Sequence, residues 1–559
     1  MMKKVTTLLF INILILNCLI AQSPAKYWVQ FTDKEGSPYS IERPEEFLSP
    51  RAIENRKFFN IGINEADIPV NQHYITTIMS LDSGMMLFTK SKWLNGITVY
   101  SQIDSIQTMI EQLPFVKHCE KTITMKNPEN HYSVPFYYAP KGAPKVIEPA
   151  SNDELDYGKG AEQLKINNIH WLHRMGFKGE GMIMMVMDAG FQNADTIRHF
   201  RKIFEENRIL GGRNFVLPEN SIYRKDSHGT AVFSCIAANI PGELIGSAPH
   251  VMAYFAVTED SRTENVVEED NWVAGIEWAD SLGCKVLNSS LGYTKFDDTL
   301  RKRSFKDLNG ETSRASMAAT IAASKGMIVC NSAGNSGEKS WKYIGSPADA
   351  KDILAVGAVN AQGEKASFTS LGPTADRRIK PDAVAVGEKT WVGNSLGKTV
   401  HANGSSFSSP LIAGMVACLW QAFPNKTNYE IMEAVRKSGA LYSEPDKALG
   451  YGITDFMKAY NLLLQPDLNF PENIVFNSFS TTTKKDFFIQ ISNNRPVNVK
   501  ITSTLRGSNT STTQTHQIEK ESSVKVKLPK LNKKQKYALI DVVIKSNDFE
   551  RKFVIGLEH

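Results

Sequence analysis

The middle of the chain alternates short apolar runs with longer helical segments, and this alternation restricts the fold more than any other feature of the sequence. The apolar runs are GMIMMVMD, KVLNSSLG, MIVCNSAG and ILAVGAV, and a typical helical segment is SRASMAATIAASKG. Apolar strands separated by helices are typical of a parallel sheet with helices on both faces. We therefore predict an α/β fold, with a doubly wound and mostly parallel sheet, over residues 156–465. In such sheets ligands bind at the carboxyl ends of the strands.

The segment before this region, residues 22–124, is predicted to be a small α+β domain. It begins with the apolar run KYWVQF, which is typical of a strand. Next, SPRAIENRKFF predicts a helix with Ser49 as N-cap and Pro50 at the first position, where a proline is tolerated. A second predicted helix, DSIQTMIEQL, has Asp104 as N-cap, and a hairpin and a last strand complete the domain.

Two other segments lack helical periodicity. Residues 125–155 are rich in Pro, Asn and Ser, which indicates a linker that includes the processing region. Residues 466–559 contain the runs DFFIQI, SVKVKL, ALIDVVIK and KFVIGL. Their alternation of apolar and polar residues predicts a C-terminal β-sandwich.

Residues 1–21 have the layout of a secretory signal peptide. Two lysines precede an apolar stretch that ends in Ala21, after which a cut is expected. The apolar stretch is shorter than a membrane span. Cys18 leaves a lipid anchor as an alternative, although Asn17 stands where a small residue is preferred. We therefore predict a chain that is secreted or held at the cell surface, with no membrane span after signal removal.

Composition excludes several classes of protein. Of the 559 residues, 42% are apolar and 22% charged, as in a soluble globular protein. The formal net charge of +5 arises from the C-terminal segment, without the basic and aromatic pattern of a nucleic-acid-binding surface. Five cysteines follow Cys18, and no CxxC pair occurs. We predict buried free thiols rather than a disulfide framework.

Three polar sites in the central region are candidates for chemistry. Asp188 ends the run GMIMMVMD, and His228 precedes Gly229 and an apolar helical run. The serines of NGSSFSSPLIAG precede a predicted helix, residues 409–420, that is apolar on all faces. Pro410 fits only near the first turn of a helix, so the serines lie at its entrance, where free N–H groups stabilise negative charge. Taken singly, each site also fits a turn, a loop or a helix cap.

In this order, the stretches VMDAG, HGTAV and GSSFSSP resemble the aspartate, histidine and serine motifs of the subtilisin-like serine peptidases (subtilases). The resemblance implies that Asp188, His228 and Ser406 are catalytic. A fourth stretch, NSAGNSG, is similar to the family segment that carries the oxyanion-hole asparagine, here Asn335. The resemblance covers roughly residues 157–464 and implies a subtilisin-like sheet.

Several residues depart from the family motifs. Ser405 stands where the family usually has Thr, Ser408 where it has Ala, and Phe407 where it has Met. Ala189 follows the aspartate in place of Thr or Ser. None of these changes removes a catalytic atom, so they affect the geometry and the shape of the subsites rather than the reaction.

The resemblance implies a serine endopeptidase that hydrolyses protein or peptide substrates through an acyl-enzyme intermediate. His228 would take the proton from Ser406, while Asp188 orients the imidazole. Two segments would form the walls of the substrate pocket, with a glycine at its floor. These substrate-binding residues are Ser290, Leu291, Gly292, Ser332, Ala333, Gly334 and Gly345. The acidic run TENVVEEDNW either lines the cleft and favours basic substrate residues or forms a solvated edge.

The N-terminal α+β domain is similar to the propeptide of subtilases, which assists folding and blocks the cleft. We predict a zymogen whose prodomain is an intramolecular inhibitor and is cut off by the enzyme itself, between about residues 139 and 157. A permanent N-terminal domain is the alternative. Calcium is frequent in the family, but no loop of the DxDxDG type occurs here. We therefore expect no required cofactor or metal, with structural calcium left open, and a monomeric enzyme.

Two functions from other classes fit the sequence less well. A catalytically idle adhesin or carbohydrate-binding surface protein would have no reason to keep Asp188, His228, Asn335 and Ser406 together. An esterase with the α/β-hydrolase fold would have the chain order Ser, acid, His, which is not the order found here. Covalent labelling by a fluorophosphonate separates the idle protein from the peptidase.

Overall fold

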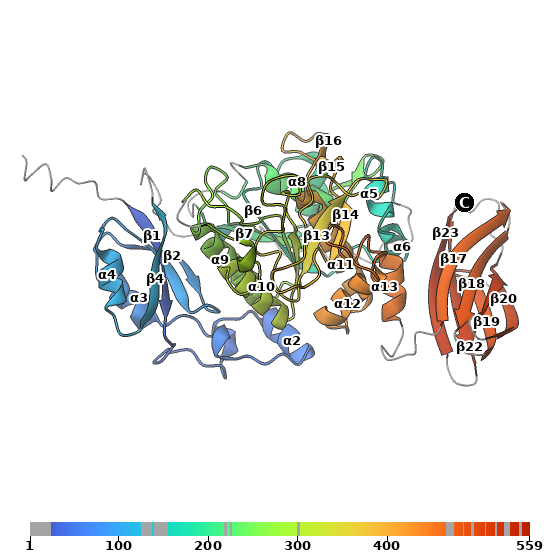
Figure 1. Cartoon of the computed structure of the whole chain (residues 1–559), viewed down its shortest axis with the longest axis horizontal. Helices are drawn as coiled ribbons and strands as arrows, with labels where there is room; N and C mark the ends of the chain where they lie inside the picture. The colour runs from blue at the N-terminus through green and yellow to red at the C-terminus, as the bar shows by residue number, and fades with distance from the viewer. Residues whose placement is uncertain are drawn as a thin grey trace, which may run out of the picture.

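The computed structural model of the chain has three parts in sequence order, an N-terminal, a central and a C-terminal domain, which lie in a row (Figure 1). The structure describes residues 24–124, 137–138, 155–216, 221–223, 226–298, 302–464, 474–483, 486–493, 497–508, 510–519, 522–529, 537–546 and 550–558. The predicted signal peptide and nearly all of the predicted linker, with its processing region, lie outside the described residues.

The N-terminal domain is a four-stranded antiparallel sheet in the order β2-β3-β1-β4, with helices packed on it. Its elements are β1 (Ala25–Phe31), η1 (Pro44–Glu46), α2 (Pro50–Phe58), η2 (Glu65–Asp67), α3 (Gln72–Met79), β2 (Met86–Ser91), β3 (Gly96–Ser101), α4 (Ile106–Glu111) and β4 (Val116–Thr124). The predicted cap of α2 is confirmed, because the Ser49 side chain accepts a hydrogen bond from the N–H of Ala52 at 3.2 Å.

The predicted cap of α4 is wrong. The helix begins at Ile106, after Ser105, and has no side-chain cap. A turn after β3 is the reason: the N–H of Ile103 donates to the Ser101 hydroxyl at 3.0 Å, and the N–H of Ile106 donates to the carbonyl of Ile103 at 3.1 Å. This turn places Asp104 ahead of the capping position.

The central domain is built on a parallel sheet, as predicted. The strand order is β14-β13-β12-β11-β6-β10-β7-β5, in which all strands are parallel except β5, which pairs antiparallel with β7. These strands are β5 (Tyr137–Tyr138), β6 (Ile183–Asp188), β7 (Ile209–Asn214), β10 (Met252–Val257), β11 (Val286–Ser289), β12 (Ile328–Ser332), β13 (Leu354–Val359) and β14 (Ala383–Val386). The four apolar runs of the sequence thus become β6, β11, β12 and β13.

Helices cover both faces of this sheet (Figure 1). The helices of the domain are α5 (Ala161–Lys165), α6 (Ile169–Arg174), η3 (Arg198–Phe200), α7 (Arg201–Glu205), α8 (His228–Ala237), α9 (Val267–Ser281), η4 (Phe305–Asp307), α10 (Arg314–Ser324), α11 (Ser405–Ala422), α12 (Asn428–Ser438) and α13 (Phe456–Leu463). Along β6, Met184 and Val186 pack in the core of α8 and α11, whereas Met185 and Met187 pack in the core of α9. This burial on both faces explains why β6 is apolar throughout.

Two short antiparallel pairs complete the central domain. They are β8 (Asn239–Ile240) with β9 (Leu244–Ile245), and β15 (Thr390–Gly393) with β16 (Thr399–Ala402). The five cysteines that the structure describes are free and buried, as predicted; they are Cys119, Cys235, Cys284, Cys330 and Cys418.

The C-terminal domain consists of two antiparallel sheets, in the orders β17-β18-β21 and β20-β19-β22-β23. Its strands are β17 (Ile474–Thr483), β18 (Asp486–Asn493), β19 (Val497–Leu505), β20 (Ser511–Ile518), β21 (Ser522–Lys527), β22 (Tyr537–Lys545) and β23 (Glu550–Glu558). Side chains from both sheets, including Val526 and Ile540, share one core. The domain contacts α13 through Asn461, whose side chain exchanges two hydrogen bonds with the backbone of Val554.

Candidate active site

Asp188 is the last residue of β6 and is fully buried at the carboxyl edge of the sheet. Its Oδ1 accepts a hydrogen bond from the N–H of Ala189 at 2.8 Å and contacts the Nδ1 of His228 at 2.7 Å. Its Oδ2 is buried and has no hydrogen-bond partner in the described part of the chain. The carboxylate is therefore held by a single oxygen, which faces the imidazole.

His228 is the first residue of α8, and Gly229 lets this helix approach β6. A Cβ atom at position 229 would lie 2.5 Å from the carbonyl oxygen of Gly190 and 2.8 Å from the Cβ of Asp188. The backbone N–H of His228 donates to the Asp226 carboxylate at 2.7 Å. The sequence pair His-Gly is thus explained by the close packing that brings the imidazole to the aspartate.

The environment of His228 raises its pKa above the ordinary value. Burial alone would lower the pKa of this imidazole, but the charge of Asp188, the hydrogen bond to Asp188 and the charge of Asp226 outweigh it. The His228 side chain is still 35% exposed. No hydrogen bond to its Nε2 occurs among the described residues, so this ring nitrogen is available to a new partner.

The serine motif forms the start of α11, which begins at Ser405, four residues before the predicted start of the helix. Pro410 is the sixth residue of the helix and not part of its first turn. A proline has no N–H to donate to the carbonyl four residues earlier, which is that of Ser406. The Ser290 hydroxyl donates to this carbonyl at 2.8 Å instead. Ser290 therefore satisfies the backbone group that Pro410 leaves unpaired.

Ser406 is buried in the first turn of α11. The ring of Phe407, the following residue, has its centroid 5.8 Å from that of the His228 ring. The Ser406 hydroxyl donates a long hydrogen bond, 3.4 Å, to the carbonyl of Ser290. Among the described residues, no hydrogen bond joins the hydroxyl to the imidazole.

Asn335 is oriented by Ser405, a contact that the sequence did not indicate. The Asn335 Oδ1 accepts hydrogen bonds from the backbone N–H of Ser405 at 2.8 Å and from its hydroxyl at 2.9 Å. The same hydroxyl accepts from the N–H of Gly334 at 3.0 Å. These bonds fix Oδ1 on the side of Ser405, so the donor Nδ2 points to the other side of the amide. Gly404, with a φ of 148°, leaves room for it, since a Cβ there would lie 3.3 Å from Nδ2.

The first predicted pocket wall follows directly after β11. Ser290, Leu291 and Gly292 continue this strand beyond Ser289. The carbonyl of Leu291 accepts a hydrogen bond from the Asn331 side chain at 3.1 Å. This bond joins the wall to the neighbouring strand β12.

The second predicted wall, at the end of β12, meets the predicted floor. Ser332 ends the strand, and the N–H of Ala333 donates to the carbonyl of Val356 at 2.8 Å. A Cβ at Gly334 would lie 4.0 Å from the backbone nitrogen of Gly345. The structure thus brings Gly334 and Gly345 together, although they are eleven positions apart in the sequence.

An acidic cavity of about 410 Å³ lies beside the first wall. Its lining combines wall residues with carboxylates: Ala189, Glu259, Asp260, Ser261, Arg262, Thr263, Glu264, Glu268, Ser290, Leu291, Gly292 and Asp297. Burial raises the pKa of Glu264 to about 7, with a contribution from the neighbouring charges of Asp297 and Glu269. The acidic run TENVVEEDNW is thus divided. Glu264 and Glu268 line the cavity. Glu269 and Asp270 are buried in ion pairs, with Arg303 and Arg314 respectively.

Comparison with known proteins agrees with this geometry. A model of the "Subtilase family" matches residues 179–452, and a model of the "Peptidase S8 propeptide domain, Bacteroidota" matches residues 26–133. Subtilisin NAT of Bacillus subtilis subsp. natto is 30% identical over 294 residues, which cover 52% of this chain and 68% of that protein. The chain belongs to the subtilase family.

Two further proteins are similar to this subtilase. A subtilisin of Bacillus pumilus is 30% identical over 294 residues, 52% of this chain and 94% of that protein. A thermostable alkaline protease of Halalkalibacterium halodurans is 28% identical over 279 residues, 50% of this chain and 67% of that protein. The subtilase is therefore a serine endopeptidase with an N-terminal propeptide domain.

Subtilases commonly bind structural calcium, so we tested whether the carboxylates of this subtilase fit a metal ion. Within the described ranges, no group of three or more His, Cys, Asp or Glu side chains is arranged to hold one. In the acidic cavity, both oxygens of Glu268 accept hydrogen bonds from backbone N–H groups, those of Asp260 and Asn265. Among the same described residues, no helix has the length and apolar character that a membrane span requires.

Proposed function

We propose that this subtilase is a secreted serine endopeptidase, made as a zymogen, that cuts peptide bonds through a triad of Asp188, His228 and Ser406. The observation that carries the proposal is the 2.7 Å contact between Asp188 Oδ1 and His228 Nδ1, beside the helix start that holds Ser406. Acyl transfer requires an oriented imidazole together with a nucleophile, and here the nucleophile would be at a helix N-terminus.

In the proposed reaction, the Ser406 hydroxyl turns from the Ser290 carbonyl to the Nε2 of neutral His228. The weak 3.4 Å bond to Ser290 makes this rotation inexpensive, and catalytic hydrogen bonds often tighten only when substrate binds. Ser406 Oγ attacks the peptide carbonyl while its proton passes to His228. The imidazolium, stabilised by Asp188, then gives the proton to the leaving amine, and water hydrolyses the acyl-enzyme by the same route.

The oxyanion of the tetrahedral intermediate would be bound by two donors. One is the Asn335 Nδ2, which the bonds to Ser405 leave available. The other is the backbone N–H of Ser406 in the first turn of α11, where N–H groups have no partner within the helix. Each donor of this kind lowers the barrier by about 3 kcal/mol, a magnitude known for subtilisin itself.

The N-terminal domain is proposed to be an intramolecular inhibitor of a monomeric enzyme, removed by self-cleavage between about residues 139 and 157. The match of residues 26–133 to a propeptide domain supports this part of the proposal. The proposed domain boundaries are 22–124, 125–155, 156–465 and 466–559. The proposed site of action is outside the cell or at its surface, after removal of residues 1–21.

We further propose that substrates are proteins or peptides with a basic residue near the cut. The acidic cavity beside Ser290, Leu291 and Gly292 supports this preference, because a basic side chain next to Glu264, whose pKa burial raises to about 7, favours the charged carboxylate. Mapping of cuts in a diverse peptide library by mass spectrometry tests it; cuts that are indifferent to basic residues would contradict it. Activity is expected to survive exhaustive chelation, and a large loss would contradict the absence of a required metal.

Labelling with a fluorophosphonate tests the nucleophile. We expect the full chain to be labelled at Ser406 after processing, and the Ser406→Ala variant to remain unlabelled. Ser408→Ala is the matched control, because it removes a neighbouring hydroxyl from the same motif and should label normally. N-terminal sequencing of both proteins tests self-processing: an identical start in wild type and Ser406→Ala would rule it out. Absence of labelling in wild type would favour the idle surface protein.

A further inference from the structure

One part of the N-terminal domain leaves its sheet and lies against a different surface of the central domain. Between β1 and α3 the chain runs through α2 and η2, and Figure 1 shows α2 beneath the central domain, apart from β1, α3 and α4. We call residues 49–67 the anchor. The sheet itself packs through β1 and β2 on α9, so the N-terminal domain makes two separate contacts.

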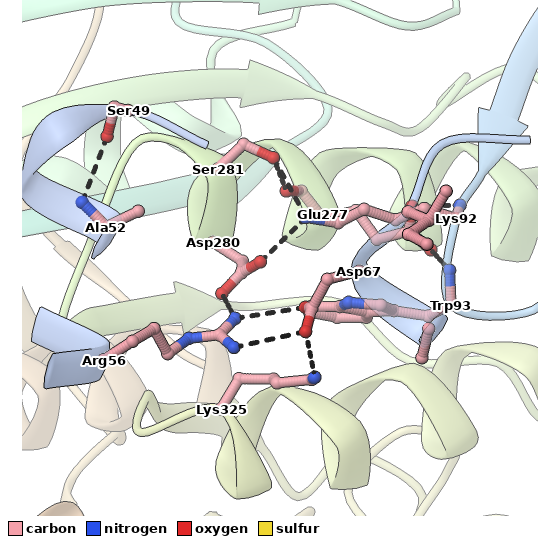
Figure 2. Close-up of polar contacts among 12 residues, drawn as sticks. Ser49, Ala52, Arg56, Asp67, Lys92, Trp93, Glu277, Asp280, Ser281 and Lys325 are labelled. Atoms are coloured by element: carbon pink, nitrogen blue, oxygen red, sulfur yellow. Dashed lines mark hydrogen bonds and ion pairs between the residues drawn. The ribbon is translucent and has the colours of Figure 1, made fainter. Parts of the chain in front are cut away.

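A chain of alternating charges joins the anchor to the central domain (Figure 2). Lys92 Nζ lies 2.8 Å from Asp280, which lies 2.6 Å from Arg56. Arg56 lies 3.4 Å from Asp67, which lies 2.6 Å from Lys325. All five residues are buried. Asp280 and Lys325 belong to the central domain and the other three to the N-terminal domain, so three of these four ion pairs cross the interface.

Apolar and backbone contacts surround this chain of charges. The Phe59 ring lies 6.0 Å from the Trp420 ring, and the ammonium of Lys285 lies 5.1 and 5.2 Å from these two rings. The Asn55 side chain donates to the carbonyl of Gly283 at 3.1 Å. The anchor therefore combines a polar centre with an aromatic edge, as tight protein interfaces do.

The anchor lies far from the cleft. Trp420 and Ser406 are both on α11, fourteen residues apart, so the two ends of the contact are separated by about 20 Å of helix. A change in the anchor can therefore alter the binding of the N-terminal domain without touching the groups that surround Ser406.

The anchor is also held in shape by its own domain. The ammonium of Lys34 donates to the carbonyls of Glu65, Ile68 and Lys92, at 2.7, 2.6 and 2.8 Å. These bonds tie the end of the anchor to the β2–β3 hairpin, which carries Lys92. A contact surface that is ordered before binding loses less conformational entropy on association.

The buried ion pairs of the anchor are more typical of an interface that can separate than of a permanent core. When two surfaces part, Asp280 and Lys325 regain water, so neither is left buried without a partner. Removing one partner while the surfaces stay together leaves an uncompensated buried charge, which is strongly destabilising. Such a network holds the two parts firmly and still leaves each part soluble after release.

We propose that the anchor is a second docking surface, which keeps the N-terminal domain bound to the central domain after the chain between them is cut. Its partner on the central domain is the surface formed by Asp280, Gly283, Lys285, Lys325 and Trp420. The proposal depends on the proposed function only for the cut itself. Departure of the N-terminal domain then requires two surfaces to open, the sheet on α9 and the anchor.

The test uses the full chain with Ser406→Ala, which prevents self-cleavage, and a site for a sequence-specific protease inserted between residues 139 and 156. After the cut, dilution followed by size-exclusion chromatography gives the dissociation constant of the N-terminal domain. With Arg56→Met we expect a dissociation constant on the order of 100-fold higher, the scale for one unpaired buried charge. Lys57→Met, an exposed change on the same helix, is the matched control and should leave the constant unchanged.

Equal dissociation constants for Arg56→Met and Lys57→Met would overturn the proposal, as would immediate release from the unsubstituted chain. Thermal unfolding before the cut shows whether each variant folds. If Arg56→Met does not fold, Asn55→Ala tests the same surface through one hydrogen bond, with an expected increase of about fivefold. None of these readouts uses peptidase activity, so a failure of fluorophosphonate labelling in wild type would overturn the proposed function and leave this result intact.

Discussion

The central domain carries two buried polar networks on different surfaces. In the cleft, Asp188 orients His228 and Ser405 orients Asn335, and each pair leaves one nitrogen without a partner among the described residues. On the surface of α9, the carboxylate of Glu277 accepts three hydrogen bonds from the N-terminal domain, from the hydroxyl of Ser91 and the N–H groups that follow it. The first network leaves His228 Nε2 and Asn335 Nδ2 available to a substrate, whereas in the second the Glu277 oxygens are already used as acceptors for another part of the chain.

This difference indicates that burial of polar groups serves two purposes in one molecule. A hydrogen-bond donor that is fixed in position and has no partner, such as Asn335 Nδ2, can stabilise a transition state without rearrangement when charge develops. Fully used acceptors are what a specific interface needs, because each unmade bond would cost its desolvation. Substitutions in one network should therefore leave the property of the other unchanged.

The largest effect is expected for Ser406→Ala. Peptidase activity should fall by about a million-fold, the scale known for loss of this group in subtilisin, because the triad acts as a unit. The dissociation constant of the N-terminal domain, measured on the cut chain, should stay within about twofold. A steady-state assay with a chromogenic peptide gives the first quantity. A large loss of binding in this variant would show that the two networks are not separate.

Asp188→Asn should lower activity by about 10,000-fold at neutral pH, because the imidazole loses its orientation and its counter-charge. In wild type, activity requires neutral His228, and the raised pKa of His228 means that activity is lost as the pH falls through a value above 6.5. Removing the charge of Asp188 should move this midpoint to lower pH. A profile of kcat/KM against pH checks both, and an unchanged midpoint in the variant would contradict the assignment.

Ser405→Ala should lower kcat by about tenfold with little change in KM, since the Asn335 amide then loses the bond from the hydroxyl and is oriented only by the Ser405 backbone N–H. Asn335→Ala should cost more, about 100- to 1,000-fold, because it removes the donor itself. Ser405→Thr keeps the hydroxyl and should restore activity. If Ser405→Ala changed KM and kcat together, or Thr failed to restore kcat, the positioning role would be wrong.

The last prediction concerns the second network, where the change in binding is spread over several pH units. Burial raises the pKa of Glu277 to about 7, against the lowering effects of Lys92 and of its hydrogen bonds. Release exposes this carboxylate, so the bound state holds a proton more tightly than the free state. Binding of the N-terminal domain is then strongest below about pH 4.5 and weakens as the pH rises to about 7, by at most about tenfold per pH unit.

Other charged groups at this interface modify the pH dependence of binding of the N-terminal domain. Asp270, which faces Thr98 and Arg314, has a pKa raised by burial to about 6 and adds to it. Asp280, between Lys92 and Arg56, has a lowered pKa and opposes it. Glu277→Gln should flatten the dependence measured on the cut chain while the pH profile of peptidase activity stays the same. A slope of the opposite sign would contradict the prediction.

The sheet and three of its motifs could be predicted from the sequence because they depend on local patterns. A strand buried on both faces must be apolar throughout, so β6, with its terminal Asp188, is visible in the sequence alone. The cap of α2 by Ser49 is equally local. The error at Asp104 shows the limit of such patterns, because the turn from Ile103 to Ile106 decided where α4 begins.

The contacts that complete the site could not be predicted because they join distant segments. The bond between Ser290 and the carbonyl of Ser406 spans 116 positions, and that between Ser405 and Asn335 spans 70. The charges of the anchor are still more hidden: Arg56 and Asp280 are 224 positions apart, and each resembles an ordinary surface residue in the sequence. Only the fold shows that they are buried together.

The reactivity of a cysteine beside the anchor, Cys284, can report whether the anchor is bound. Cys284 borders a cavity of about 20 Å³ between the central domain and Ala52, Arg56 and Phe59. Burial raises the pKa of its thiol, so the group is inert while it is covered. Departure of the anchor removes Ala52, Arg56 and Phe59 from one side of this cavity, so we expect a maleimide to modify Cys284 faster after departure than before it.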